Sequence, residues 1–211
     1  MAPLVSPTRP NLRRAVRILA RDGLVIFSTD TVYGVGGRAS SPTALARIYA
    51  AKGRQDDKPL QLILPDVSWI ARLADEVSPL VACLVEAFLP GPLTLVVRKG
   101  PGAPPGVGAA DGTVALRVPD HPTCLALARL LGEPLAATSA NRSGHPSPRT
   151  AAQAVVDLGE TVDLVLDDGP APLGVESTIV DVAHGLPRVL RVGALTAEQL
   201  EAVTGPLATL D

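Results

Sequence analysis

Short apolar runs alternate with helical patterns along nearly the whole chain, and the connections between them are short. The predicted strands cover 24–27, 60–64, 93–98, 113–118, 134–138, 162–166, 177–182 and 187–192. The predicted helices cover 12–22, 42–52, 67–74, 79–89, 122–131, 150–158 and a last one from residue 196. Such an alternation is typical of a single α/β domain with helices flanking a twisted sheet. Because three strands follow one another late in the chain, we expect a mixed parallel and antiparallel sheet.

Capping residues mark several predicted helix ends. Asn11 is placed to cap the first helix. The pairs Thr150/Gln153 and Thr196/Gln199 have the spacing of a capping box, in which side chain and backbone at a helix start bond each other reciprocally. Residues 28–37, between the first strand and the second helix, are polar and glycine-bearing, and we expect a loop there.

The chain is long enough to form one domain with a substantial core. It has 211 residues, of which 46% are hydrophobic, and a chain of this size buries roughly 70% of its unfolded surface. This composition excludes intrinsic disorder. Three prolines in the first ten residues indicate a loose tail, so we predict a domain over 11–205 with tails at 1–10 and 206–211.

Neither a membrane span nor a secretory signal is indicated. The longest apolar stretch, 77–97, is interrupted by Glu86 and by prolines. Arginines stand near the N-terminus where a signal peptide needs an apolar stretch. Cys83 and Cys124 lie in apolar helical patterns and lack metal-ligand spacing, so we expect reduced core thiols. These features predict a cytoplasmic protein without membrane contact.

Composition also excludes several kinds of binding site. His121, His145 and His184 have no further Cys or His at zinc spacing, so no protein-held metal is expected. One Trp, two Tyr and two Phe are too few for a stacking platform for single-stranded nucleic acid. The net charge of -2 gives no global attraction to nucleic acid.

Polar loops at strand ends are where open α/β sheets bind ligands, and two of them lie early in this chain. Residues 28–36 combine hydroxyls with glycines, which suits either close approach to a ligand or a turn with capping hydroxyls. Residues 52–59 hold three cations, Lys52, Arg54 and Lys58. They form either a cradle for phosphate oxygens or a solvated loop paired with neighbouring aspartates.

Two later segments have the same character. Residues 138–150 bring together hydroxyl, amide and guanidinium groups, but no base stands at a convincing offset from Ser139, which argues against a serine nucleophile. Residues 174–179 open a strand with a polar run. Arg117 interrupts an apolar strand and Arg191 ends another. Each of them therefore snorkels, meets a buried acid or binds an anion.

Read together, the polar segments resemble the Sua5/YciO/YrdC family. Ser-Thr-Asp-Thr-Val-Tyr-Gly-Val-Gly at 28–36 resembles the family's Pro-Thr-Glu-Thr-Val-Tyr-Gly-Leu-Gly. Lys-Gly-Arg at 52–54 resembles its Lys-x-Arg element, and Ser-Ala-Asn at 139–141 and Glu-Ser-Thr-Ile at 176–179 match two later ones. These motifs occur in the family's order, and the resemblance covers about residues 11–195.

The resemblance implies a nucleotidyltransferase that makes threonylcarbamoyl-AMP from L-threonine, bicarbonate and ATP, with release of pyrophosphate. Mg²⁺ is expected to travel with ATP, held by substrate phosphates and by no protein ligand. The product would feed the t6A modification of tRNA through downstream transfer proteins. The chemistry needs positioning and positive charge, and no protein nucleophile.

The family's binding positions map onto this sequence residue by residue. By this resemblance the threonine-binding residues are Thr31, Arg117, Ala137 and Ser177. The ATP-binding residues are Lys52, Arg54, Lys58, Thr113, Ser139, Asn141, Ser147 and Arg191, with Lys52 and Arg54 acting electrostatically on the phosphates. Ser28 and Asp30 depart from the family's Pro and Glu, and Ile63 replaces a threonine-contacting His of some members.

Three other readings remain open on sequence grounds. An RNA-binding module would use Arg142, Arg149 and the cations of 52–58 on the nucleic acid backbone, tRNA included. A YciO-type paralogue would share these motifs and act on another substrate. A serine hydrolase would need a base near Ser139 or Ser177.

Overall fold

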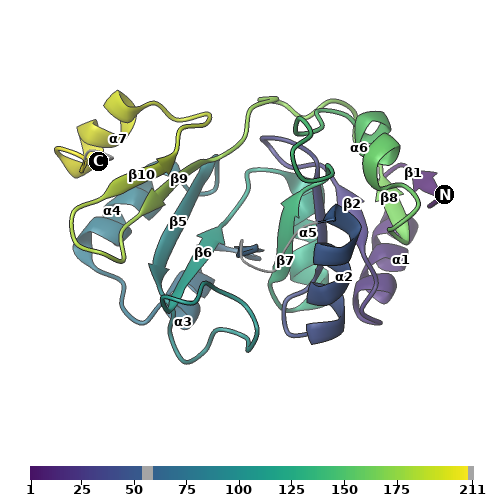
Figure 1. Cartoon of the computed structure of the whole chain (residues 1–211), viewed down its shortest axis with the longest axis horizontal. Coiled ribbons are helices and arrows are strands. Elements are labelled where there is room, and N and C mark those ends of the chain that lie inside the picture. The colour runs from purple at the N-terminus through teal and green to yellow at the C-terminus, as the bar shows by residue number, and fades with distance from the viewer. Residues whose placement is uncertain (54–58, 209–211) are drawn as a thin grey trace.

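A computed structural model describes residues 1–53 and 59–208 of the chain (Figure 1). The described part contains seven α-helices and one sheet of ten strands, which confirms the predicted α/β class with a mixed sheet. The helices are α1 (Arg9–Leu19), α2 (Pro42–Lys52), α3 (Ile70–Leu73), α4 (Pro79–Phe88), α5 (Pro122–Leu131), α6 (Ala151–Leu158) and α7 (Ala197–Thr204). The strands are β1 (Leu4–Val5), β2 (Val25–Phe27), β3 (Gly34–Arg38), β4 (Gln61–Ile63), β5 (Leu93–Arg98), β6 (Thr113–Arg117), β7 (Leu135–Ser139), β8 (Leu164–Leu166), β9 (Thr178–Asp181) and β10 (Arg188–Arg191).

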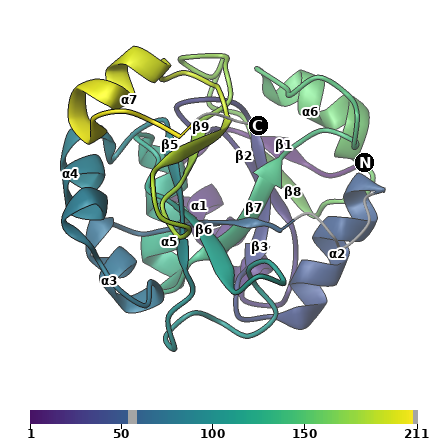
Figure 2. The same ribbon diagram turned by 60° about the vertical axis from the view of Figure 1, so that its left-hand side comes forward.

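The strands follow the order β1-β8-β2-β3-β7-β4-β6-β5-β9-β10 across the sheet. β2 pairs parallel with β8, β4 with β6, and β5 with β9, whereas β3 and β7 pair antiparallel with their neighbours. Figure 1 shows β5, β9 and β10 in one half of the molecule and β2, β7 and β8 in the other, and Figure 2 shows the twist between them. The short strand β4 joins the two halves through β6 and β7.

The two faces of the sheet are packed differently, because successive side chains of a strand point to opposite faces. One face, with Ile26, Leu62, Leu95 and Leu116, belongs to the larger apolar cluster, to which α2, α4 and α6 also contribute. The other face is covered by α1 and α5 near β2 and β7. Towards β5 and β9 this second face carries polar residues, and the ligand cavity described below lies there.

Residues 34–38 form a strand, β3, so the prediction of a loop through residue 37 is wrong. Three of its five residues are glycine, which has a low preference for β-strands. Side chains of neighbouring elements nevertheless leave little room for a larger residue at these positions. A Cβ on Gly36 would lie 3.0 Å from the Phe27 ring, and one on Gly37 would lie 3.0 Å from Ala44 Cβ. Close packing therefore decides the conformation here.

The N-terminal residues also differ from the prediction. Leu4 and Val5 pair with β8, so residues 1–10 are not a loose tail. α1 begins at Arg9 after Thr8, and Asn11 lies inside the helix, where its amide donates to Ser6 O instead of capping. Proline in the first turn explains the earlier start, because its lost N–H has no helical partner at that position.

Of the two expected capping boxes only the one at Thr196 and Gln199 forms. At α6, the Thr150 hydroxyl accepts a hydrogen bond from the backbone N–H of Gln153, as expected. The Gln153 side chain, however, accepts from the backbone N–H of Arg149 and not from that of Thr150. The helix start predicted from the motif is correct, and only half of the reciprocal bonding is present.

The exposed side of α1 is basic. Arg9, Arg13 and Arg17 follow one another at four-residue intervals, which places them on one helix face. They line a groove of about 350 Å³. Within residues 1–53 and 59–208, every helix is too short or too polar to cross a lipid bilayer.

Candidate functional site

A cavity of about 550 Å³ lies on the polar part of the sheet. The register of the strands determines which residues form its floor. Gln61 of β4 pairs with Ala115 of β6 and with Ala137 of β7, and Ala115 also pairs with Val96 of β5. Residues two positions along, such as Thr94 and Arg117, share that face. The cavity is lined by Thr31, Val32, Pro59, Gln61, Thr94, Val96, Ala115, Arg117, Ala137, Thr138, Ser139, Glu176, Ser177, Ile179, Leu190 and Arg191.

Arg117 is the largest fully buried side chain, 2% exposed, and its guanidinium has three protein partners. Nη2 lies 2.5 Å from Asp30 Oδ1, Nη1 donates to Thr31 Oγ1 at 2.8 Å, and Nε donates to Gly91 O at 3.1 Å. The sequence left three fates open for this arginine, and the structure shows that it meets a buried acid. These contacts use three of the five N–H groups of a guanidinium, which leaves two N–H groups without a partner in the described part of the chain.

Arg191 approaches the same cavity from the end of β10. Its Nη1 lies 2.7 Å from Glu176 Oε2, while Nε and Nη2 donate to Ser177 O at 3.2 and 2.9 Å. Burial lowers the pKa of the guanidinium, and the Glu176 carboxylate opposes that shift. Arginine nevertheless stays charged, because its ordinary pKa is far above neutrality.

Hydroxyl groups continue this network across the floor. Arg191 Nη2 donates to Ser177 Oγ at 3.1 Å, and Ser177 Oγ lies 2.8 Å from Thr94 Oγ1. Thr94 in turn donates to Gln61 Oε1 at 3.1 Å. No histidine or carboxylate contacts Ser177 or Ser139 in the described part of the chain, so the structure offers neither serine a base.

Lys52 is buried, 4% exposed, and points into the loop that follows β7. Its Nζ donates to Ser139 O and Asn141 O, both at 2.7 Å, and lies 3.4 Å from Asn141 Oδ1. These acceptors match the three donors of an ammonium group. Lys52 therefore supports the loop that follows β7, and its expected contact with phosphates stays a prediction. Arg54 and Lys58 lie outside the described residues.

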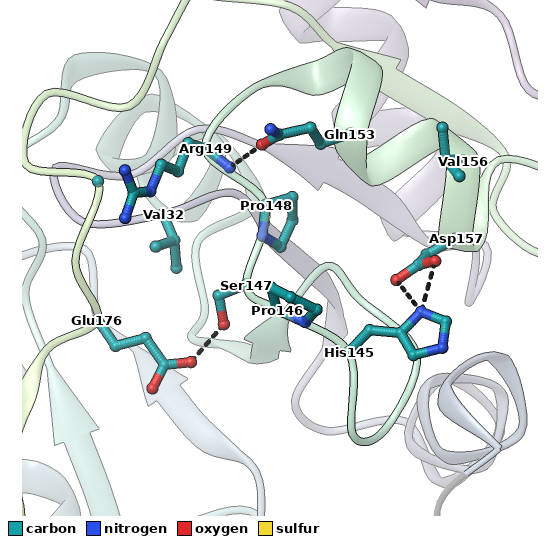
Figure 3. A pocket seen from close by; sticks show the side chains of 11 residues that line it. Val32, His145, Pro146, Ser147, Pro148, Arg149, Gln153, Val156, Asp157 and Glu176 are labelled. Atoms are coloured by element: carbon teal, nitrogen blue, oxygen red, sulfur yellow. Dashed lines mark hydrogen bonds and ion pairs between the residues drawn. The ribbon is translucent and has the colours of Figure 1, made fainter.

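A second cavity, of about 800 Å³, opens beside α6 (Figure 3). Figure 3 shows Ser147 donating to Glu176, and the His145 ring against Asp157 at 2.9 Å. Burial works to raise the pKa of Asp157, but hydrogen bonds from His145 and the Arg142 amide outweigh it and lower the pKa. Val32 and Glu176 line both cavities, which therefore share a wall.

The predicted site residues are brought together only in part. Thr31, Arg117, Ala137, Ser139, Ser177 and Arg191 line the first cavity, and Ser147 lines the second. Thr113 instead donates its hydroxyl to Asp111, and the Asn141 amide donates to backbone oxygens of its own loop. Both residues support loops, and neither is among the described residues that line these two cavities.

Four residues of the network were not selected from sequence, although each had a signal. Gln61 is a polar interruption of an apolar strand, and Thr94 is the second residue of the strand that follows Pro90-Gly91-Pro92. Asp30 and Glu176 stand inside recognised motifs beside selected residues. The missing element was the pairing of each carboxylate with an arginine far away in sequence.

The described residues hold no group of three or more potential metal ligands. Glu176 lines both cavities and is paired with Arg191, and Asp157 lines the second cavity and contacts His145. Asp30 is paired with Arg117, which lines the first cavity. A magnesium ion that arrives with a nucleotide is commonly held by phosphate oxygens, with few protein ligands. The donor set here fits that arrangement better than a dedicated metal cage.

Comparison with known proteins gives concordant matches. The model of the family Sua5/YciO/YrdC, described as telomere recombination, matches residues 17–193. A threonylcarbamoyl-AMP synthase of Bacillus subtilis (strain 168) is 42% identical over 204 residues, which are 96% of this chain and 59% of the relative. A putative threonylcarbamoyl-AMP synthase of Mycobacterium tuberculosis (strain H37Rv) is 41% identical over 90% of this chain and 88% of the relative.

A solved structure agrees with these matches. Pyrococcus abyssi Sua5 complexed with L-threonine superposes with a TM-score of 0.92 and 37% identity, over 97% of this chain and 61% of that one. The chain thus spans about three fifths of the length of this structure and of the Bacillus relative.

Proposed function

Since the chain belongs to the Sua5/YciO/YrdC family, we propose that it makes threonylcarbamoyl-AMP from L-threonine, bicarbonate and ATP. The threonine amine and bicarbonate condense to a carbamate with loss of water. A carbamate oxygen then attacks the α-phosphorus of ATP, and the bond to the leaving pyrophosphate breaks. The relatives named as synthases of this product support the proposal.

The single observation that carries the proposal is that Arg117, on the floor of the first cavity, is buried and uses only three of its N–H groups in contacts with described residues. A buried guanidinium with two N–H groups left over is suited to a small carboxylate, which it can hold in a planar fork. Hydroxyls of Thr31 and Ser177 line the same cavity. An amino acid bound there would be fixed at its carboxylate, with its amine free to react.

The second cavity offers room for the nucleotide. It holds Ser147 and adjoins Arg191 through Glu176. A nucleotide in this cavity would place its phosphates at the shared wall, next to the amino acid. Mg²⁺ bound to those phosphates would neutralise charge that develops on the leaving pyrophosphate. The protein contributes positioning and positive charge, which are the main sources of catalysis in phosphoryl transfer.

The product is a mixed anhydride and hence an activated carrier of its threonylcarbamoyl group. We expect it to be consumed in the t6A modification of tRNA, by transfer proteins that act after this one. The isolated chain should therefore form the adenylate and leave tRNA unmodified. Localisation in the cytoplasm, where tRNA is modified, is part of the same proposal.

The test is incorporation of labelled bicarbonate into an adenylate in the presence of ATP and Mg²⁺. L-Threonine is compared with L-serine and L-valine, which lack its methyl or its hydroxyl group. Labelled product and pyrophosphate with threonine alone would establish the activity and its specificity. A product with another amino acid would indicate a paralogue, and no adenylate with any of the three would overturn the proposal.

A further inference from the structure

Glu176 places a carboxylate in the wall between the two cavities, where a nucleotide would carry its negative charge. Each of its oxygens is engaged. Ser147 donates to one, as Figure 3 shows, and Arg191 lies 2.7 Å from the other. Both partners are residues that the family resemblance assigns to ATP. A carboxylate that contacts two groups expected to bind a phosphate requires an explanation.

Arg191 has little left to offer a phosphate while this contact lasts. Nε and Nη2 are directed at Ser177, and one N–H of Nη1 is directed at Glu176. The carboxylate also neutralises the arginine charge. A phosphate could gain the planar two-pronged contact typical of arginine only after Glu176 withdraws.

The structure lets the side chain of Glu176 move while its backbone stays fixed. Glu176 O accepts from the Ala194 amide at 2.9 Å, and a Cβ on Gly193 would lie only 2.2 Å from that oxygen. The side chain of Glu176 is 33% exposed and that of Arg191 is 40% exposed. Half-exposed ion pairs are weak, typically below about 1 kcal/mol, so an incoming anion can replace one.

We propose that Glu176 is a surrogate anion, which holds Ser147 and Arg191 until a phosphate group of the nucleotide displaces its carboxylate. The inference rests on the proposed function, because that function supplies the nucleotide. It assigns Glu176 a further role after the reaction. The returning carboxylate competes with pyrophosphate for the same two groups and so favours product release.

The experiment measures binding of inorganic pyrophosphate by calorimetry, in low salt without Mg²⁺. Glu176→Gln keeps the size of the side chain and removes its charge. We expect the Kd to fall about three- to tenfold, which corresponds to about 0.7–1.4 kcal/mol. The matched control is Glu160→Gln, at an exposed position that lines neither cavity, which removes the same charge and should leave Kd unchanged.

A double-mutant cycle identifies the groups that Glu176 masks. In an Arg191→Gln background the Glu176→Gln change should no longer tighten pyrophosphate binding, because the masked group is absent. Thermal unfolding of each variant verifies that the fold is retained. If Glu176→Gln binds pyrophosphate equally well or more weakly, or gains as much without Arg191, the proposal is wrong.

These outcomes are separate from failure of the proposed function. Adenylate synthesis by the unaltered protein is measured in parallel. Synthesis without tighter pyrophosphate binding in Glu176→Gln would reject the surrogate anion and keep the synthase. Tighter binding without any adenylate would keep the masked anion site and reject the synthase.

Discussion

Two arginine–carboxylate pairs border the same cavity, and they differ in how far their side chains are exposed to solvent. In the Arg117–Asp30 pair the side chains are 2% and 8% exposed, whereas in the Arg191–Glu176 pair they are 40% and 33% exposed. A buried charge must keep its partner, because water cannot replace it. A half-exposed charge can exchange its partner for solvent or ligand. Burial therefore separates a fixed framework from a movable contact at one site.

The largest effect should follow from neutralising the buried pair. Asp30→Asn leaves Arg117 without its counter-charge, and removing one member of a buried pair destabilises a protein by about 3–5 kcal/mol. Urea denaturation measures the free energy of unfolding. Asp30→Glu, the residue usual in the family, is the control and should recover most of it. A loss below about 1 kcal/mol for Asp30→Asn would show that the pair does not support the fold.

Lys52 extends the comparison to a buried cation that contacts neutral oxygens of Ser139 and Asn141 among the described residues. Lys52→Ala removes three contacts and leaves the carbonyls of Ser139 and Asn141 unpaired. Hydrogen bonds to charged groups contribute about 1.5–3 kcal/mol, so we expect a loss of at least that size. Denaturation should show lower stability together with lost adenylate synthesis. Full stability with lost activity would instead place Lys52 against the phosphates.

The exposed pair should matter for binding and little for folding. Arg191→Gln is expected to change the free energy of unfolding by less than about 1 kcal/mol. The KM for ATP should rise about tenfold, through loss of a phosphate contact. Steady-state kinetics and denaturation on the same preparation measure both quantities. An effect on stability as large as that of Asp30→Asn would remove the contrast between the pairs.

The smallest effect concerns His121, which is buried close to the fixed pair. Burial lowers its pKa from the ordinary 6.5, against the attraction of Asp168 and Asp30. The unfolded chain therefore binds this proton more readily, and stability falls as pH drops below about 6.5. His121→Gln should flatten that dependence by less than about 1 kcal/mol. Unchanged pH dependence of unfolding between pH 7 and 5 would contradict it.

Local signals predicted much of the fold. Ser41 before Pro42, with Gly53 at positive φ after the last turn, fixes both ends of α2 as expected. Strand β5 has the predicted bounds, 93–98. β3 was missed because its glycines are required by Phe27 and Ala44, which lie in the neighbouring elements β2 and α2. Propensity describes a residue's own preference and carries no information about such neighbours.

The site was predictable to the same extent. Polar loops and charged interruptions of apolar strands indicated where ligand chemistry would lie, and most of the selected residues do line the cavities. What could not be predicted is which carboxylate each arginine meets. Asp30 and Arg117 are 87 residues apart, and only the fold brings them together. For the same reason the sequence did not predict that Lys52 donates to the backbone of the loop after β7.

The arginine row on α1 has a consequence for how the molecule behaves at charged surfaces. The first 21 residues contain five arginines and no acidic residue, although the whole chain has a net charge of -2 and a sequence pI near 5.9. Charge is thus distributed unevenly along the chain, and α1 presents a positive face. At neutral pH we expect retention on a cation-exchange matrix in low salt, in a single preferred orientation, where the pI alone predicts flow-through. Salt screens charges that lie more than one Debye length away, about 10 Å at 0.1 M salt. An adsorbing surface therefore interacts with the charges on the nearest face of the protein and not with its net charge.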